Sequence, residues 1–458
     1  MSLMQQSLRA ALASSGGTPS KSKGANGLQK DKRTPMGSRR GTPRGTPAHS
    51  HPGSDAEEDD ELSSDSEEMF SPYASTASIG AGDDATGLAL DGQDDNALQE
   101  MMRAQIDSLN EKRTSTREEA LQWLIRAMSM RYAAHAMDGS EETFFDALRR
   151  SIRAGKSSKE TMLAARAMAL WFVTLGAERE AEYDELASFL KPTIKSCRFP
   201  PVKAQCILTL AMGCFVACQD PYEIADTARF CHSIASMPKE TPEVLESALV
   251  SLGLLLSCLN RTPRQVEQLF AETIAAHRTL LESNSLPVRI ACGHNIALFY
   301  HTLGVPMVRA LDVSQHTALL TTLQALATDS SRSRGKKERS QQRAVFRDVL
   351  HTVHTGESPV VRHRVMDHLL AFDDWAQIHR FFAFRTVLNQ GLHTHFEEND
   401  LLHDVFGTAF ATQQLIDPAG ERVVHDTKSA VAKYRAIEKN RQLEQRYNQT
   451  LGMYNDSE

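Results

Sequence analysis

The chain has 458 residues, of which 24% are charged, 41% hydrophobic and 6% aromatic, and its formal net charge at pH 7 is -7. This length allows a domain with a substantial core, while the low aromatic and hydrophobic shares predict that part of the chain is unfolded. No run of eighteen or more uncharged apolar residues occurs, and the N-terminal apolar segment is too short for a secretory signal. We therefore expect a soluble intracellular protein without a membrane span.

Residues 1–96 are rich in Ser, Thr, Gly and Pro and keep no helical or strand period, so we expect a disordered arm. Its charge is divided into a basic block from Lys21 to Arg44 and an acidic block from Asp55 to Glu68. A solvating tail is compatible with this composition. A phosphorylation-regulated arm is compatible with it too, because several hydroxyl residues precede proline or lie among acids. These are Thr18, Thr34, Thr42, Thr46 and Ser71 before proline, and Ser63, Ser64 and Ser66 among acids.

Residues 97–327 carry apolar residues at a helical period throughout. A hydroxyl of the cluster 114–116 is expected to cap a helix whose first turn holds acids. Gly176 stands where a helix should end. Trp123 and Trp171 fall in apolar stripes, so we expect both in the core.

Three similar apolar segments begin at Pro201, Pro242 and Pro287, which are 41 and 45 residues apart. Proline suits the first turn of a helix, and the few charges that follow indicate helices buried on most sides. Further helical segments at 159–175, 221–235 and 263–281 complete the alternation. A period of about 40–47 residues is typical of HEAT and armadillo repeats, so the sequence predicts an all-α, armadillo/HEAT-like α-solenoid.

All seven cysteines lie within this array, and Cys214 and Cys218 stand four residues apart, on one helix face rather than in a CxxC pair. We interpret the cysteines as small buried hydrophobic residues of a protein in a reducing compartment. A metal site built from these two residues with Cys231 and His232 is the alternative. We expect neither a metal nor a cofactor.

Residues 328–340 form a polar segment that we predict to be an exposed basic loop between two structural parts. A nuclear localisation signal, a nucleic-acid contact and a merely solvated loop are all compatible with its clustered cations. These cations are Arg332, Arg334, Lys336, Lys337 and Arg339.

Residues 341–420 are expected to form a small mixed or α-rich module docked on the end of the array. It opens with a helix at 341–353 that has apolar and cationic sides, and aromatic residues gather at 373–388. Its histidines lack HExxH spacing, so surface and interface histidines are favoured over a metal site at His393, His395 and Glu397.

Residues 421–458 contain a helix candidate at 425–448 with cations over most of its surface and few apolar residues. A helix with so little to bury is expected to project from the body, and its natural partner is anionic. Its cations are Lys428, Lys433, Arg435, Lys439, Arg441 and Arg446.

The chain resembles the interferon-related developmental regulator family, as a fungal member of it. The resemblance is most specific in two segments, Gln341–Leu350 and 385–407. The second matches a V-L-x-x-G-h-x-x-H core followed by N-[DE]-h-L-x-x-h-F, where h is apolar. The matching residues are Val387, Leu388, Gly391, His395, Asn399, Asp400, Leu402 and Phe406. The resemblance runs from about Leu98 to the end of the chain. It implies an armadillo-like fold without enzymatic activity, and links to transcriptional co-regulation and to idle ribosomes, where a C-terminal helix occludes RNA paths.

We therefore expect a non-enzymatic, monomeric, cytoplasmic ribosome-binding factor that occupies inactive ribosomes and blocks tRNA and mRNA sites, with the nucleus as a second location. The cations of the loop 328–340 and of the tail would contact rRNA, and the groove of the array would face rRNA or ribosomal protein. The alternative is a nuclear co-regulator scaffold that binds transcription regulators in that groove. No Gly-rich phosphate loop, nucleophile elbow or metal-spaced cluster indicates catalysis.

Overall fold

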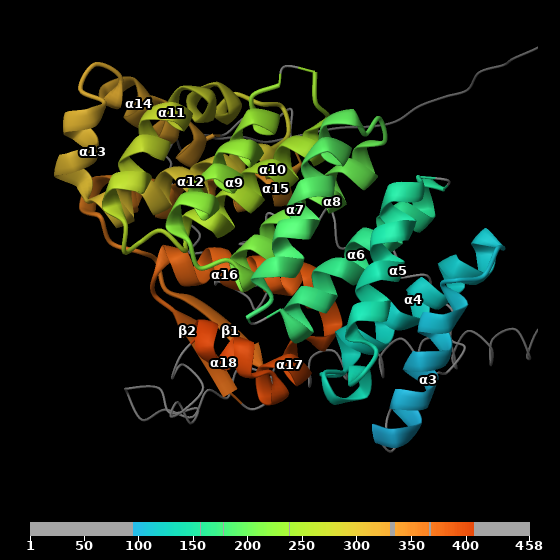
Figure 1. Cartoon of the computed structure of the whole chain (residues 1–458). Helices are drawn as coiled ribbons and strands as arrows, with labels where there is room; N and C mark the ends of the chain where they lie inside the picture. The colour runs from blue at the N-terminus through green and yellow to red at the C-terminus, as the bar shows by residue number, and fades with distance from the viewer. Residues whose placement is uncertain are drawn as a thin grey trace, which may run out of the picture. The chain divides into compact units, whose positions relative to one another are not determined.

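The computed structural model describes residues 95–155, 157–176, 178–237, 239–329, 335–365 and 368–406, all within one compact unit, Glu61–Glu458. Most of the predicted arm, residues 330–334 of the basic loop and the whole predicted tail lie outside these residues. Figure 1 shows the described part as a succession of helices with one short hairpin near its C-terminal end.

Six helices form a central row in which each member packs against the next. The four in the middle of the row, α6, α8, α10 and α12, are apolar on most sides, as expected for helices with neighbours all around. We call them the central helices: α4 (Thr114–Met130), α6 (Ser158–Leu175), α8 (Pro200–Ala217), α10 (Pro242–Leu256), α12 (Leu286–Leu303) and α15 (Lys336–Thr355).

A second set of helices flanks this row, and each packs against the central helix that follows or precedes it in the chain, except the short η2, which packs against α3. The flanking helices are α3 (Asp95–Ser108), η2 (His135–Met137), α5 (Glu141–Ala154), α7 (Glu180–Ser196), α9 (Pro221–Ala235), α11 (Pro263–Leu281), α13 (Val305–Leu311) and α14 (His316–Ala327). The alternation of central and flanking helices is the predicted armadillo/HEAT-like α-solenoid, so the fold class is confirmed.

A ladder of side-chain hydrogen bonds repeats along the central row at the period of the sequence repeat. In each rung, a polar side chain of one central helix donates to a backbone carbonyl of the preceding one, which satisfies a buried donor without a charge. The rungs join residues 44, 43 and 46 positions apart: Thr209 to Ala165 O at 2.8 Å, Ser247 to Ala204 O at 2.7 Å, and Asn295 to Leu249 O at 2.9 Å.

Helix ends follow the predicted signals with one exception. Helices α8 to α12 begin with proline in the first turn, and α6 ends one residue before Gly176. The expected hydroxyl cap at 114–116 is wrong: α4 has Arg113 at its N-cap position and no side-chain capping bond. Arg117 instead ties the start of α4 to the preceding loop and to α6, because its guanidinium donates to the Glu111 and Lys112 carbonyls and pairs with Glu160.

The core runs through the whole array and includes both expected tryptophans to different degrees. Trp171 is 1% exposed, while Trp123 is partly buried against the core. Among the described residues, only α8 is long and apolar enough to cross a membrane, but 72% of it is buried by other helices. Helix α8 therefore has the environment of a core helix, as its place in the central row requires.

The chain after α14 departs from the expected boundaries. Helix α15 begins at Lys336, inside the predicted loop 328–340, and packs on α12 and α14 as the last central helix. An antiparallel hairpin follows, with β1 (Val361–Val365) and β2 (His368–Phe372) paired from Val361↔Phe372 to Val365↔His368. The chain then forms α16 (Trp375–Leu388), η3 (Asn389–Gly391), α17 (Leu392–Glu398) and α18 (Asp400–Phe406).

Helix α16 packs on α12, α10, α6 and α4, so it lies across the central row and not at the end of the array. The expectation of a module docked on that end is wrong, because ten of the fourteen residues of α16 are buried and need contacts on many sides. We call residues 375–406 the clasp, since they connect central helices that are far apart in the sequence (Figure 1).

Candidate functional site

The first candidate surface is a row of cations along α15. Lys336, Arg339, Arg343 and Arg347 follow one another at intervals of three or four residues, which places them on one face of the helix. Lys336 and Arg347 are exposed, and the other two are partly exposed. None of these four forms an ion pair within the part of the chain that the structure describes. We call them the α15 stripe.

The surroundings of the α15 stripe add to its positive potential. Its first members stand at the N-terminus of a 20-residue helix, where the helix dipole contributes further positive charge. Two acids are near in sequence, Glu338 in the first turn and Asp348 beside Arg347. Burial raises the pKa of Asp348 to about 6, which weakens its opposition to the cations below that pH. An anion is the ligand that this surface favours.

Only three of the predicted RNA-binding residues lie within the described part of the chain. Lys336, Lys337 and Arg339 lie in the first turn of α15. Sequence reasoning named neither Arg343 nor Arg347, although their spacing of four residues in QQRAVFRDVL is a readable signal. The remaining predicted residues lie outside the described residues: Arg332, Arg334, Lys428, Lys433, Arg435, Lys439, Arg441 and Arg446.

The groove of the central row was the second expected partner surface, and α16 occupies part of it. Arg380 of α16 donates from Nε to Ser257 Oγ at 3.1 Å and from Nη2 to Ser257 O at 2.5 Å. Its guanidinium also lies 5.7 Å from the centre of the Phe215 ring. Gly253 makes room for His379, because a Cβ at that position would lie 2.4 Å from His379 Nδ1.

The second half of the clasp is held by the residues of the V-L-x-x-G-h-x-x-H and N-[DE]-h-L motifs. Gly391 lies against α4 so closely that a Cβ there would be 1.6 Å from Ser129 O. Asn399 donates to Val173 O at 3.0 Å, and its Oδ1 accepts from Leu401 N at the start of α18. The motif therefore describes the attachment of the clasp to α4 and α6.

Comparison with known proteins decides the family. The sequence profile of the interferon-related developmental regulators (IFRD) matches residues 69–354. The chain is 30% identical over 339 residues to interferon-related developmental regulator 2 of Mus musculus, covering 70% of this chain and 76% of that protein. The chain belongs to the interferon-related developmental regulator family.

Other relatives of this IFRD protein include a fungal one. An uncharacterised protein of Schizosaccharomyces pombe is 23% identical over 342 residues, which cover 67% of this chain and 74% of that protein. Among solved structures, an engineered protein is 16% identical, covers 56% of this chain and 98% of its own, and aligns with a TM-score of 0.38. A designed armadillo repeat protein is 15% identical, and the match covers 55% of this chain and 99% of that protein, with a TM-score of 0.37.

Four of the described histidines of this IFRD protein are almost fully buried, and the sequence did not indicate which histidines these would be. His277, His294, His379 and His395 are at most 3% exposed. Burial lowers the pKa of His294 to about 3 and of the other three to about 4. His379 and His395 lie between the clasp and the central helices, so the interface interpretation is right for them and the surface interpretation is wrong.

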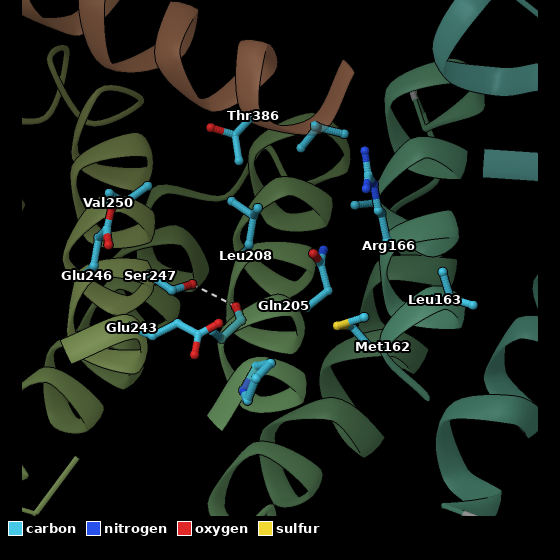
Figure 2. Close-up of a pocket in the computed structure, with 14 residues that line it drawn as sticks. Met162, Leu163, Arg166, Gln205, Leu208, Glu243, Glu246, Ser247, Val250 and Thr386 are labelled. Atoms are coloured by element: carbon cyan, nitrogen blue, oxygen red, sulfur yellow. Dashed lines mark hydrogen bonds between the residues drawn. The ribbon is translucent and has the colours of Figure 1, made fainter. Parts of the chain in front are cut away.

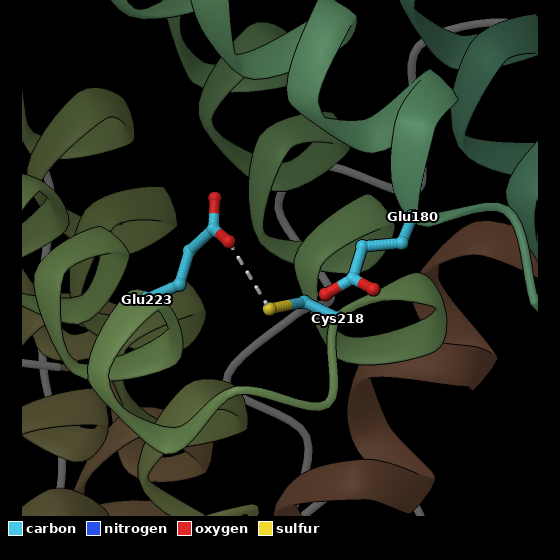
Figure 3. Close-up of side chains that lie close together, drawn as sticks. All are labelled: Glu180, Cys218 and Glu223. Carbon is cyan, nitrogen blue, oxygen red and sulfur yellow. Dashed lines mark hydrogen bonds between the residues drawn. The ribbon is translucent and has the colours of Figure 1, made fainter.

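The described residues contain one group with the spacing of metal ligands, made of Glu180, Cys218 and Glu223 (Figure 3). Their ligand atoms lie within 4.8 Å of one another. Cys218 Sγ donates towards Glu223 Oε2 at 3.7 Å, and a hydrogen bond with Cys214, with burial, raises the pKa of its thiol. A metal binds the thiolate, whereas this thiol is protonated. A structural zinc site also needs four ligands, and this group offers three, so the group does not favour such a site.

Proposed function

We propose that this IFRD protein is a non-enzymatic regulator that binds ribosomes, occupying inactive ones and blocking tRNA and mRNA sites. The observation that carries the proposal is the α15 stripe, a row of four cations without ion pairs in the described part of the chain. Ribosomal RNA offers closely spaced phosphates, and cations that neutralise them release counterions into solution. We infer a monomer that acts in the cytoplasm, with rRNA and ribosomal proteins as partners.

The position of the clasp favours an end of the array over its groove as the contact surface. Helix α16 already packs on four of the central helices, so a large partner would have to displace it to use that part of the groove. Helix α15, as the last central helix, packs mainly on α12 and α14, and the face that carries the α15 stripe is exposed or partly exposed. The alternative function, a nuclear scaffold that binds transcription regulators in the groove, has correspondingly less support.

Neutralising the α15 stripe tests the proposal. In the variant Lys336→Gln, Arg339→Gln, Arg343→Gln, Arg347→Gln, co-sedimentation with purified ribosomes should weaken at least about tenfold at moderate salt. The slope of log affinity against log salt should become shallower by up to about four, one for each phosphate that the variant no longer neutralises. The measurement is a sucrose-gradient sedimentation series between low and moderate salt.

A matched variant removes the same charge elsewhere on the array. Lys112, Lys239, Arg261 and Arg264 are exposed and lie outside α15, so their change to Gln should leave the sedimentation unaltered. If ribosome binding weakened equally in both variants, the effect would be due to net charge alone. If the stripe variant still bound ribosomes as the parent does, the proposal would be contradicted. Deletion of Thr427–Glu458 separately tests the predicted tail, and purely nuclear accumulation without a ribosomal peak would favour the scaffold alternative.

A further inference from the structure

The groove contains a pocket beside α16 that none of the features above uses. Three central helices, α6, α8 and α10, form its walls, and Thr386 and Val387 of α16 close one end (Figure 2). Its cavity volume is about 60 Å³. The lining is mostly apolar, with Met162, Leu163, Leu208 and Val250, and it holds the ionisable side chains Glu243, Glu246 and Arg166.

Glu246 is the unusual member of this lining. The residue is only 4% exposed, and its Oε1 has no hydrogen-bond partner. Its neighbour Ser247 cannot supply one, because that hydroxyl donates to Ala204 O. Burial, with a smaller contribution from Glu243, raises the pKa of Glu246 to about 8. A buried carboxyl oxygen without a donor is costly, and a cationic donor would relieve it.

The charges around the pocket are distributed unevenly between its walls. Glu243 and Glu246 both come from α10, whereas Arg166 comes from α6, on the other side of Leu208 and Gln205 in Figure 2. Burial raises the pKa of Glu243 as well, which indicates that water solvates this carboxyl poorly. The α10 wall therefore favours an ammonium or guanidinium group, and the apolar lining suits the aliphatic stem that carries it.

The chain leaves the described part of the structure at the helix that closes one end of this pocket, α16. Phe406, the last described residue, packs its ring 5.8 Å from the Phe384 ring of α16, centre to centre. Phe384 precedes the pocket residue Thr386 by two positions. The segment 428–446 begins 22 residues after Phe406, and 22 residues can span at most roughly 75 Å when fully extended. Because the segment belongs to the same chain, its encounter with the pocket is intramolecular.

The segment 428–446 has the composition that the pocket requires. It carries six cations and two acids, and apolar residues such as Val431, Tyr434 and Ile437 stand between the cations. We propose that the pocket is a binding site for a lysine or arginine side chain of this segment of the same chain, held beside Glu243 and Glu246. A cation held there cannot contact RNA at the same time, so the pocket competes with any polyanion for the segment.

Zero-length carbodiimide coupling in the full chain tests this proposal without any RNA present. The reagent joins a carboxyl to a lysine amine only when the two are in contact. We expect an amide between Glu243 or Glu246 and one of Lys428, Lys433 and Lys439, identified by mass spectrometry. Trypsin provides the second readout, because cleavage within 428–446 should be several-fold slower than in the variant Glu243→Gln, Glu246→Gln.

An exposed pair of acids is the matched control, and Glu119→Gln, Glu282→Gln should leave both readouts unchanged. Slow cleavage that the pocket variant relieves supports the proposal even without an amide, since an arginine cannot form one. Equal cleavage in the parent and the pocket variant overturns it. Coupling to Lys21, Lys23, Lys30 or Lys32, or between light and heavy isotopic copies, also overturns it, because the occupant is then the arm or a second chain.

Discussion

His395 and Met128 are 267 residues apart in the sequence, and His395 Nε2 lies 2.8 Å from Met128 O. A carbonyl oxygen can only accept, so Nε2 carries the hydrogen and Nδ1 is left as an acceptor. Asn399 Nδ2 lies 3.2 Å from that Nδ1 and 3.0 Å from Val173 O, and it donates to both. One neutral histidine and one amide thus attach the clasp to the ends of α4 and α6.

Replacing Asn399 by Ala should destabilise the protein by about 1–3 kcal/mol, because two buried acceptors lose their donor and α18 loses its first-turn bond to Leu401 N. The midpoint of urea unfolding measures this destabilisation. Glu398→Ala changes the neighbouring exposed residue and should cost within about 0.5 kcal/mol. Similar midpoints for the two variants would show that the amide does not hold the clasp.

Gly391→Ala should be more damaging, because the added Cβ would lie 1.6 Å from Ser129 O and 2.5 Å from Ser129 C. Backbone of α4 cannot give way as a flexible side chain can, so the clasp must move off α4. We expect a destabilisation of more than about 3 kcal/mol, or faster amide hydrogen exchange throughout 389–406 if the clasp detaches as a unit. Gly335→Ala, where no atom lies within 4 Å of the added Cβ, is the control and should behave as the parent.

The repeat period and the buried helices were predictable because they depend on local signals. Proline at the first turn and a run of apolar residues mark each central helix, and their spacing alone predicts the solenoid. The path of α16 was not predictable in this way. A helix that is apolar on most sides must be buried, but nothing in its own sequence says which of several buried surfaces receives it.

In the candidate site, too, only the residues with a local sequence signal were predicted. The cations at the start of α15 were found because they cluster in the sequence, while Arg343 and Arg347 join them only through the helical period. Glu246 was missed because the two acids of the run PEVLESALV are both expected on the surface of a helix, and only the neighbouring helices bury Glu246. The same applies to His294 and His379, whose burial depends on contacts between α12 and α16.

Acid should destabilise the protein through its buried histidines. His277, His379 and His395 have a pKa of about 4 in the folded state, and His294 of about 3, against about 6.5 in the unfolded chain. Below pH 6.5 the unfolded state therefore binds more protons, and stability falls as the pH decreases. Each such histidine contributes up to about 1.4 kcal/mol per pH unit, measurable as urea midpoints between pH 7.5 and 5.

The variant His379→Gln isolates one of these contributions. Its ring Nε2 has no hydrogen-bond partner, so the amide loses no bond there, and the slope of stability against pH below 6.5 should become shallower by up to about 1.4 kcal/mol per unit. His135→Gln changes an exposed histidine and should keep the parental slope. An unchanged slope in the first variant would mean that His379 is protonated in the folded protein.

Glu246 should make stability fall as the pH rises, which is opposite to the effect of the histidines, and the variant Glu246→Gln tests this. Its pKa of about 8 in the folded state lies above the value of about 4.3 in the unfolded chain, so the folded state binds more protons between these values. Stability contributed by this group is present at low pH and is lost as the pH rises towards 8. Glutamine keeps the shape without the charge, so the variant should be more stable than the parent at pH 8.5 and close to it at pH 5.

The comparison with Glu282→Gln separates this effect from net charge, since Glu282 is exposed and its change should shift the stability at both pH values equally. High salt sharpens the test, because it screens any cation that the segment 428–446 brings to the pocket and leaves the buried carboxylate uncompensated. The gain of the Glu246→Gln variant at pH 8.5 should therefore increase with salt. A gain that is equal at pH 5 and pH 8.5 would show that the carboxyl is ionised at both, and that its burial does not control its protonation.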